Sequence, residues 1–112
     1  CAARARIRIE GVPISEAEIA KFFWAVGERL EQTPHRALET TPLRPVYFRF
    51  MTILAFHVFI SLEVSATLLE VGIGGMYDST NIVQHPVVTG VTARGLDHTA
   101  ILGHTLEEVA WQ

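Results

Sequence analysis

The sequence predicts an α/β fold in which helices flank a mostly parallel sheet in three layers. Two short apolar runs, at residues 67–71 and 87–91, are continuous rather than alternating, which is typical of central strands covered on both faces. Helical patterns lie before and after these runs, and strands that alternate with helices favour a parallel sheet. The chain of 112 residues is the size of one domain at most.

The composition is that of an ordinary globular protein. Hydrophobic residues make up 49% and charged residues 19% of the chain, which argues against disorder. The net charge of −3 gives no reason to expect nucleic acid or an acidic membrane as the main partner. Cys1 is the single cysteine, so a reducing compartment is expected, and no apolar run reaches membrane-spanning length. Because the first residue is not Met, we expect a processed, internally cloned or incomplete chain.

Residues 3–10 are predicted to form a strand with one solvent-facing side. Arg4, Arg6 and Arg8 alternate with Ala5, Ile7 and Ile9, which is the period of two of a half-exposed strand. The three arginines could meet a phosphate group, but a solvated strand face is the favoured interpretation.

An amphipathic helix is predicted over residues 15–32. Ser15 and Glu18 have the spacing of a capping box. Apolar residues recur at helical spacing after them: Ile19, Phe22, Phe23, Val26 and Leu30. We interpret Phe22, Phe23 and Trp24 as core residues rather than as a cofactor-binding cluster.

A buried helix is predicted over residues 48–60, after a proline-containing loop over residues 33–45. Its apolar residues lie on nearly all sides, which suits a buried helix. His57 is interpreted as a hydrogen-bonded core residue rather than a ligand. Another helix is predicted to begin at residues 105–111, because Thr105 and Glu108 repeat the capping-box pattern.

Polar residues gather where the two predicted sheet strands end, which is where open α/β sheets bind ligands. Glu70 ends the first strand, just before three glycines within residues 72–75, and Asp97 and His98 follow the second. A carboxylate in a core strand needs a cation, a hydrogen-bond partner or an exit to solvent. Magnesium binding and a carboxylate beyond the sheet edge both agree with the periodicity. Tyr77 occupies the third glycine position of a dinucleotide fingerprint, which excludes a Rossmann dinucleotide site.

A family resemblance is carried by residues 69–81, which read Leu-Glu-Val-Gly-Ile-Gly-Gly-Met-Tyr-Asp-Ser-Thr-Asn. This run resembles the signature of the folylpolyglutamate synthases of the Mur ligase superfamily. Its Gly-Gly-x-Tyr-Asp-x-Thr-Asn form is similar to the eukaryotic branch. The similarity continues at residues 86–91, 95–103 and 108–112, and upstream at residues 6–9, 11–15 and 47–52. The resemblance therefore covers nearly the whole chain.

The resemblance implies an ATP-dependent ligase of folate and one-carbon metabolism. Such an enzyme adds L-glutamate to the γ-carboxyl group of tetrahydrofolate polyglutamates through an acyl phosphate, with reduced folates and L-glutamate as substrates and with ATP and Mg²⁺. Glu70 corresponds to a magnesium-binding glutamate, and His98 to a histidine that helps to hold a second magnesium ion. Phe48 and Asp78 match positions of the folate pterin pocket. Asp97, next to His98, could fix the tautomer of that imidazole.

The resemblance also implies a partial domain. Residues 1–112 correspond to part of an N-terminal ATP-binding domain, the P-loop-type central domain of Mur ligases, without the P-loop and without the C-terminal domain. A lysine of the family is expected just beyond Gln112. The isolated chain is therefore expected to bind ATP poorly and not to ligate glutamate, and it holds no catalytic or nucleotide-binding residue by this comparison. Arg94 stands where relatives carry an apolar residue, a change that nothing in the sequence explains.

Other interpretations stay open. Dihydrofolate synthase shares the scaffold, although the loop that contains Tyr77 favours the polyglutamate enzyme. A non-catalytic, truncated folate-binding relic and a truncated gene product without a role are further alternatives. The family implies a monomer without a membrane-spanning segment, in the cytoplasm, the mitochondrion or both.

Overall fold

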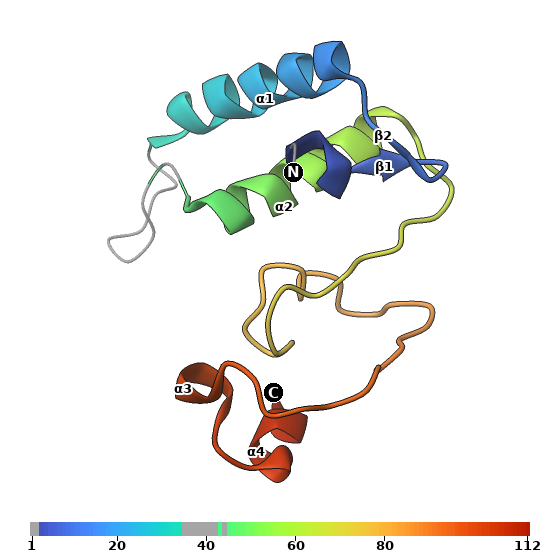
Figure 1. Ribbon diagram of the computed structural model, residues 1–112. Coiled ribbons are helices and arrows are strands. Elements are labelled where there is room, and N and C mark those ends of the chain that lie inside the picture. Colours follow the sequence, from blue (N-terminus) through green and yellow to red (C-terminus); the bar gives the residue numbers. More distant parts are fainter. Residues whose placement is uncertain (1–2, 35–42, 44) are drawn as a thin grey trace. The chain divides into compact units, whose positions relative to one another are not determined.

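The computed structural model describes residues 3–34, 43 and 45–112. The chain divides into two compact units, Cys1–Thr67 and Leu68–Gln112. Figure 1 shows the elements in chain order, which are η1 (Ala3–Arg6), β1 (Arg8–Ile9), β2 (Val12–Pro13), α1 (Glu16–Glu31), α2 (Tyr47–Ser61), α3 (Thr99–Leu102) and α4 (Leu106–Trp111).

The N-terminal segment forms a 3₁₀ turn, η1, and a tight hairpin of β1 and β2. The two strands pair antiparallel, with Ile9 opposite Val12. Glu10 and Gly11 between them both have positive φ, 51° and 78°, as in the type I′ turns that connect short hairpins.

The strand predicted over residues 3–10 is therefore correct only for Arg8–Ile9. The Arg8 side chain explains part of the difference, because it donates hydrogen bonds to the carbonyls of Ala5 (3.3 Å) and Gly11 (2.9 Å). These bonds hold the backbone in turns on both sides of Arg8, where a longer strand would need it extended.

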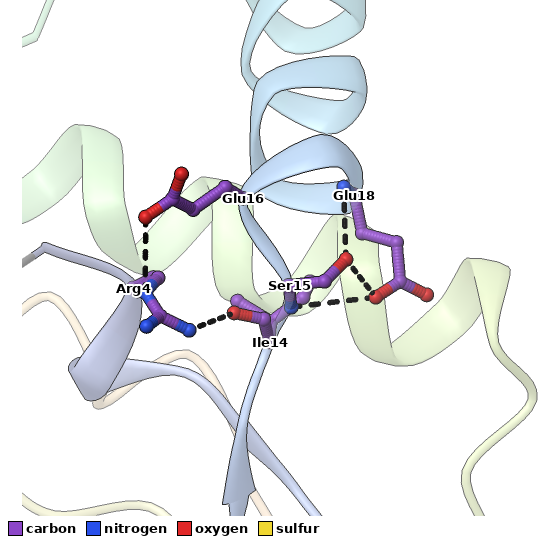
Figure 2. A network of polar contacts seen from close by, with 5 residues as sticks. All are labelled: Arg4, Ile14, Ser15, Glu16 and Glu18. Atoms are coloured by element: carbon purple, nitrogen blue, oxygen red, sulfur yellow. Dashed lines mark hydrogen bonds and ion pairs between the residues drawn. The ribbon is translucent and has the colours of Figure 1, made fainter.

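Helix α1 begins at the predicted capping box, which the structure confirms. Glu18 N–H donates to Ser15 Oγ (3.2 Å), and Glu18 Oε2 accepts from Ser15 N–H (3.4 Å) and Ser15 Oγ (2.6 Å). Figure 2 shows this network next to Arg4, which donates to the Ile14 carbonyl (3.4 Å) and lies 3.9 Å from the Glu16 carboxylate. Together these contacts join η1 to the first turn of α1.

Helix α2 lies beside α1 and completes the core of the first unit (Figure 1). The buried core residues are Ile7, Ile14, Phe22, Val26, Met51, Leu54 and Val58. The helix predicted over residues 48–60 is confirmed, but its burial on nearly all sides is wrong. Only the face of Met51, Leu54 and Val58 is buried, whereas Ile60 is 74% exposed.

The aromatic residues of the first unit differ in burial. Phe22 is 7% exposed and belongs to the core as predicted, but Phe23 is 44% and Trp24 66% exposed. His57 is also exposed, so its interpretation as a core residue is wrong. Its ring meets that of Phe22 edge-on, with 5.6 Å between the ring centroids. The loop predicted over residues 33–45 lies largely outside the described residues.

The second unit contains α3 and α4 joined to a long irregular segment. Thr105 caps α4 together with Glu108, which confirms the second predicted capping box. The strands predicted over residues 67–71 and 87–91 are absent, and Leu68 and Val87 are 98% and 104% exposed. A strand is held by hydrogen bonds to a neighbouring strand, and β1 with β2 is the only strand pair in the described part of the chain. The three-layer parallel sheet therefore stays a prediction.

Helix length and hydropathy also bear on membranes. Among the residues with described coordinates, no helix combines the length and the apolar character needed to span a bilayer.

Candidate functional site

The glycine-rich loop of the second unit, residues 72–81, is folded around the carboxylate of Asp78. Oδ2 of Asp78 accepts a hydrogen bond from Ile73 N–H (3.1 Å), and Oδ1 accepts from Thr80 N–H (2.9 Å) and from the Thr80 hydroxyl (2.6 Å). The side-chain amide of Asn81 closes the same loop by donating to the Met76 carbonyl (2.9 Å). One carboxylate thus joins the beginning and the end of the loop.

These hydrogen bonds also lower the pKa of Asp78. Burial is the largest single influence and would raise that pKa, but the Thr80 hydroxyl and the amides of Thr80, Ile73 and Gly72 together outweigh it, so that the pKa lies below the ordinary value of 3.8. The carboxylate is therefore charged at neutral pH and can act only as a hydrogen-bond acceptor.

The same loop packs against the C-terminal part of its unit. Met76 N–H donates to the main-chain oxygen of Gln112 (2.5 Å). A Cβ atom on Gly74, which has a φ of 66°, would lie 2.9 Å from Leu102 Cδ2, and one on Gly75 would lie 3.1 Å from the Gln112 oxygen. These glycines permit a close approach that a side chain would prevent. The structure thus brings the glycine-rich loop together with the end of α3 and with the residue after α4.

Asp97 lies beside His98 at the start of α3. Asp97 Oδ1 accepts a hydrogen bond from His98 N–H (2.7 Å), and Asp97 Oδ2 lies 3.8 Å from His98 Nε2. His98 has the left-handed conformation, with φ 49° and ψ 37°, which is uncommon for a residue with a side chain. Asp97 therefore holds the backbone of His98 directly, while its carboxylate is at ion-pair distance from the ring.

Glu70 offers an exposed carboxylate. None of the hydrogen bonds and ion pairs within the described residues involves its side chain. Magnesium takes hard oxygen ligands and is usually held by one or two carboxylates together with water and phosphate oxygens, so the chemistry of Glu70 fits a magnesium ligand. Across residues 3–34, 43 and 45–112, no group of three or more His, Cys, Asp or Glu side chains could hold a metal ion. No hydrogen bond or ion pair in this part of the chain joins Glu70 to His98.

Phe48 lies in the first unit, in the first turn of α2. It is 36% exposed, and Tyr47 before it is 58% exposed. The Thr52 hydroxyl donates to the Phe48 carbonyl (3.0 Å), within the regular turn of the helix. Two neighbouring aromatic rings are thus accessible at the beginning of α2, where they could stack on a flat ligand.

The three arginines of the N-terminal segment contact the protein rather than forming a solvated strand face. Arg4 and Arg8 donate to main-chain carbonyls, and the guanidinium carbon of Arg6 lies 5.7 Å from the centroid of the Tyr47 ring, within the range of a cation–π contact. Arg6 thus links η1 to the beginning of α2.

Sequence reasoning missed Thr80 and Asn81, which the structure places in the Asp78 network. Aspartate side chains often bond to the backbone two residues later, and the order Asp78-Ser79-Thr80 carried that signal. The family resemblance assigns a role to Asp78 alone and so gives no indication of the roles of Thr80 and Asn81.

Comparisons with known proteins point to one kind of enzyme. The chain is 51% identical over 107 residues to the "Probable folylpolyglutamate synthase" of Schizosaccharomyces pombe. The matched residues make up 96% of this chain and 20% of that protein. It is 51% identical over 109 residues to the mitochondrial folylpolyglutamate synthase of Bos taurus, with 97% and 18% covered. For the folylpolyglutamate synthase of Saccharomyces cerevisiae (strain YJM789) the identity is 49% over 113 residues, with 96% and 20% covered. The chain thus spans about a fifth of the length of these curated relatives. No protein-family model matches the chain, and no solved structure matches it significantly.

Proposed function

We propose that this chain, a homologue of folylpolyglutamate synthases over nearly its whole length, is part of an ATP-dependent ligase that adds L-glutamate to reduced folates. The observation that carries the proposal is the identity of 49–51% with proteins of that name across 96–97% of the chain. The reaction would join the glutamate amine to the γ-carboxyl group of a tetrahydrofolate polyglutamate, in folate and one-carbon metabolism.

In the proposed reaction, an oxygen of the γ-carboxylate attacks the terminal phosphorus of ATP, forming an acyl phosphate and releasing ADP. The glutamate amine then attacks the acyl carbon, loses a proton and expels phosphate as the amide forms. Both steps concentrate negative charge on phosphate oxygens. Bound Mg²⁺ would supply the positive charge that stabilises these oxygens.

Four residues of the chain are assigned roles in this reaction. Glu70 would hold one magnesium ion through its exposed carboxylate, and His98, beside Asp97, would help to hold a second. Phe48 would offer its ring to the flat pterin, and Asp78 would accept hydrogen bonds from the N–H groups of the pterin. The charged state of Asp78 and the exposure of Phe48 support these roles.

The wider setting is also a proposal. We assign the chain to a three-layer, mostly parallel α/β domain of the Mur ligase central type, in a monomeric enzyme of the cytoplasm, the mitochondrion or both. Relatives with mitochondrial names support the second location. Reduced folates, L-glutamate and ATP would be its substrates.

A chimera tests the proposed function. The segment of the Saccharomyces cerevisiae folylpolyglutamate synthase that matches this chain is replaced by the corresponding residues of this chain, and incorporation of labelled glutamate into tetrahydrofolate is measured. We expect the chimera to be active, and expect Glu70→Gln to lower its kcat on the order of a hundred-fold by removing a metal ligand. Glu107→Gln, which changes an exposed carboxylate of α4, is the matched control and should keep the activity.

Two results would count against the proposal. A chimera that folds and binds ATP but incorporates no glutamate would refute it. A chimera that prefers dihydropteroate to tetrahydrofolate would instead identify the segment with dihydrofolate synthase.

A further inference from the structure

We propose that Thr80 is a positioning residue of the folate site, because it holds one oxygen of Asp78 and thereby leaves the other oxygen to the substrate. This inference rests on the proposed function, in which Asp78 belongs to the pterin pocket. It assigns a role to a residue that lies two positions after Asp78 and that needs no contact with the folate.

The hydrogen bonds of the two carboxylate oxygens are unequal. Oδ1 accepts both the Thr80 hydroxyl (2.6 Å) and the Thr80 N–H (2.9 Å), whereas Oδ2 accepts Ile73 N–H (3.1 Å). The Gly72 amide also acts on the carboxylate, so both oxygens face backbone donors, but only Oδ1 is bound by a side-chain hydroxyl. A carboxylate oxygen can accept about two hydrogen bonds. Oδ1 is therefore filled by Thr80, and the remaining acceptor capacity of Asp78 lies on Oδ2.

The hydroxyl of Thr80 contributes most to this asymmetry. Its distance of 2.6 Å to Oδ1 is that of a short, charge-assisted O–H···O⁻ hydrogen bond. The Thr80 N–H would remain after a side-chain substitution, but it constrains only one direction at Oδ1. Without the hydroxyl, the carboxylate could rotate and Oδ1 would regain an open acceptor site.

A fixed carboxylate binds a flat donor better than a mobile one. The 2-amino-4-oxo pterin ring presents neighbouring N–H groups in one plane, so an acceptor oxygen must lie in that plane to bind them. An Asp78 side chain held before the folate arrives loses little rotational freedom on binding. Thr80 would therefore act on folate affinity, and only through Asp78.

The test uses the chimeric ligase and compares variants of neighbouring hydroxyl residues. Thr80→Val removes the hydroxyl but keeps the branched shape, Thr80→Ser keeps the hydroxyl, and Ser79→Ala removes a hydroxyl that makes no hydrogen bond within the described residues. KM for tetrahydrofolate, KM for ATP and kcat are measured for each variant, and equilibrium binding of tetrahydrofolate is measured without ATP.

We expect Thr80→Val to weaken folate binding and raise KM for folate about ten-fold, the size of one charge-assisted hydrogen bond, with kcat and KM for ATP little changed. Thr80→Ser and Ser79→Ala should stay within about two-fold of the parent. In the Asp78→Asn background, Thr80→Val should have no further effect, since the two residues act as one unit.

Three results would overturn the inference while the proposed function stands. These are an unchanged KM for folate in Thr80→Val, an equal loss in Thr80→Ser, or effects of Thr80→Val and Asp78→Asn that multiply. A parent chimera that neither binds nor glutamylates tetrahydrofolate would overturn the proposed function, and the inference with it.

Discussion

Replacing Leu54 by alanine should destabilise the first unit more than any comparable change on the surface of α2. Leu54 is 0% exposed and lies in the middle of the buried face between Met51 and Val58. Among the described residues of this unit, seven form the buried core, so the loss of one large side chain removes a substantial share of its packing.

The magnitude follows from the burial. Leu→Ala removes roughly three methylene-sized groups at about 0.8 kcal/mol each, or about 2.4 kcal/mol of transfer free energy. The cavity left in a core that relaxes only in part adds about 1 kcal/mol. We therefore expect Leu54→Ala to lower the free energy of unfolding by about 3–4 kcal/mol.

Ile60→Ala is the matched control, because Ile60 lies on the same helix and is 74% exposed. It should lose about a quarter of the transfer term, roughly 0.6 kcal/mol. The higher helix propensity of alanine offsets about 0.4 kcal/mol of this loss, so the control should be close to neutral.

The assay is urea unfolding of the 112-residue chain, followed by far-ultraviolet circular dichroism, since α1 and α2 dominate the helical signal. The reasoning is refuted if both substitutions shift the midpoint equally. It is also refuted if the unsubstituted chain unfolds without a cooperative transition, because the seven core residues would then not form a stable core.

Further predictions concern the cap, the loop and its charge. Ser15→Ala removes the capping oxygen of α1 and should cost about 1 kcal/mol of helix stability, measured as a lower urea midpoint. The hydrogen bonds that lower the pKa of Asp78 stabilise the folded loop fully above pH 3.8, and this contribution is lost as the pH falls through the lower folded-state pKa. A carbon-13 NMR titration should find that pKa below 3.8. A higher value would contradict the hydrogen bonds described for the Asp78 carboxylate. Gly74→Ala should destabilise the second unit by about 1–2 kcal/mol because of its positive φ, with additional cost from the contact with Leu102. Gly95→Ala, whose added Cβ would meet nothing within 4 Å, should be tolerated. Limited proteolysis of the two variants checks both expectations, since Gly74→Ala should be cleaved faster than Gly95→Ala.

Helices α1, α2 and α4 were predictable because their signals are local, whereas no sequence pattern predicted the four-residue α3. Both partners of the Ser15–Glu18 and Thr105–Glu108 capping boxes lie within three residues of each other, and both boxes are present in the structure. The helical spacing of apolar residues likewise predicted α1 and α2. The spacing could not tell which apolar residues would be covered, because Ile60 is as apolar as Leu54. The packing of α2 against the other core residues of the first unit decides between them.

The strand predictions depended on partners that the pattern does not specify. A continuous apolar run states that its residues favour burial, but a strand also needs a neighbour to bond its backbone. Leu68 and Val87 are almost fully exposed, so the runs that contain them have the composition of buried strands without their environment. The α/β prediction thus rests on the composition of these runs and on the family resemblance.

The candidate site shows how a motif and its geometry give different information. The motif identifies Asp78 by resemblance, whereas the hydrogen bonds identify Thr80 as the residue that sets the orientation of Asp78. If this division is correct, a natural relative that keeps the aspartate should carry Thr or Ser at the second position after it, since either hydroxyl can reach Oδ1. A relative with Val at that position and an unimpaired affinity for folate would show that the backbone N–H of this residue suffices to hold the carboxylate.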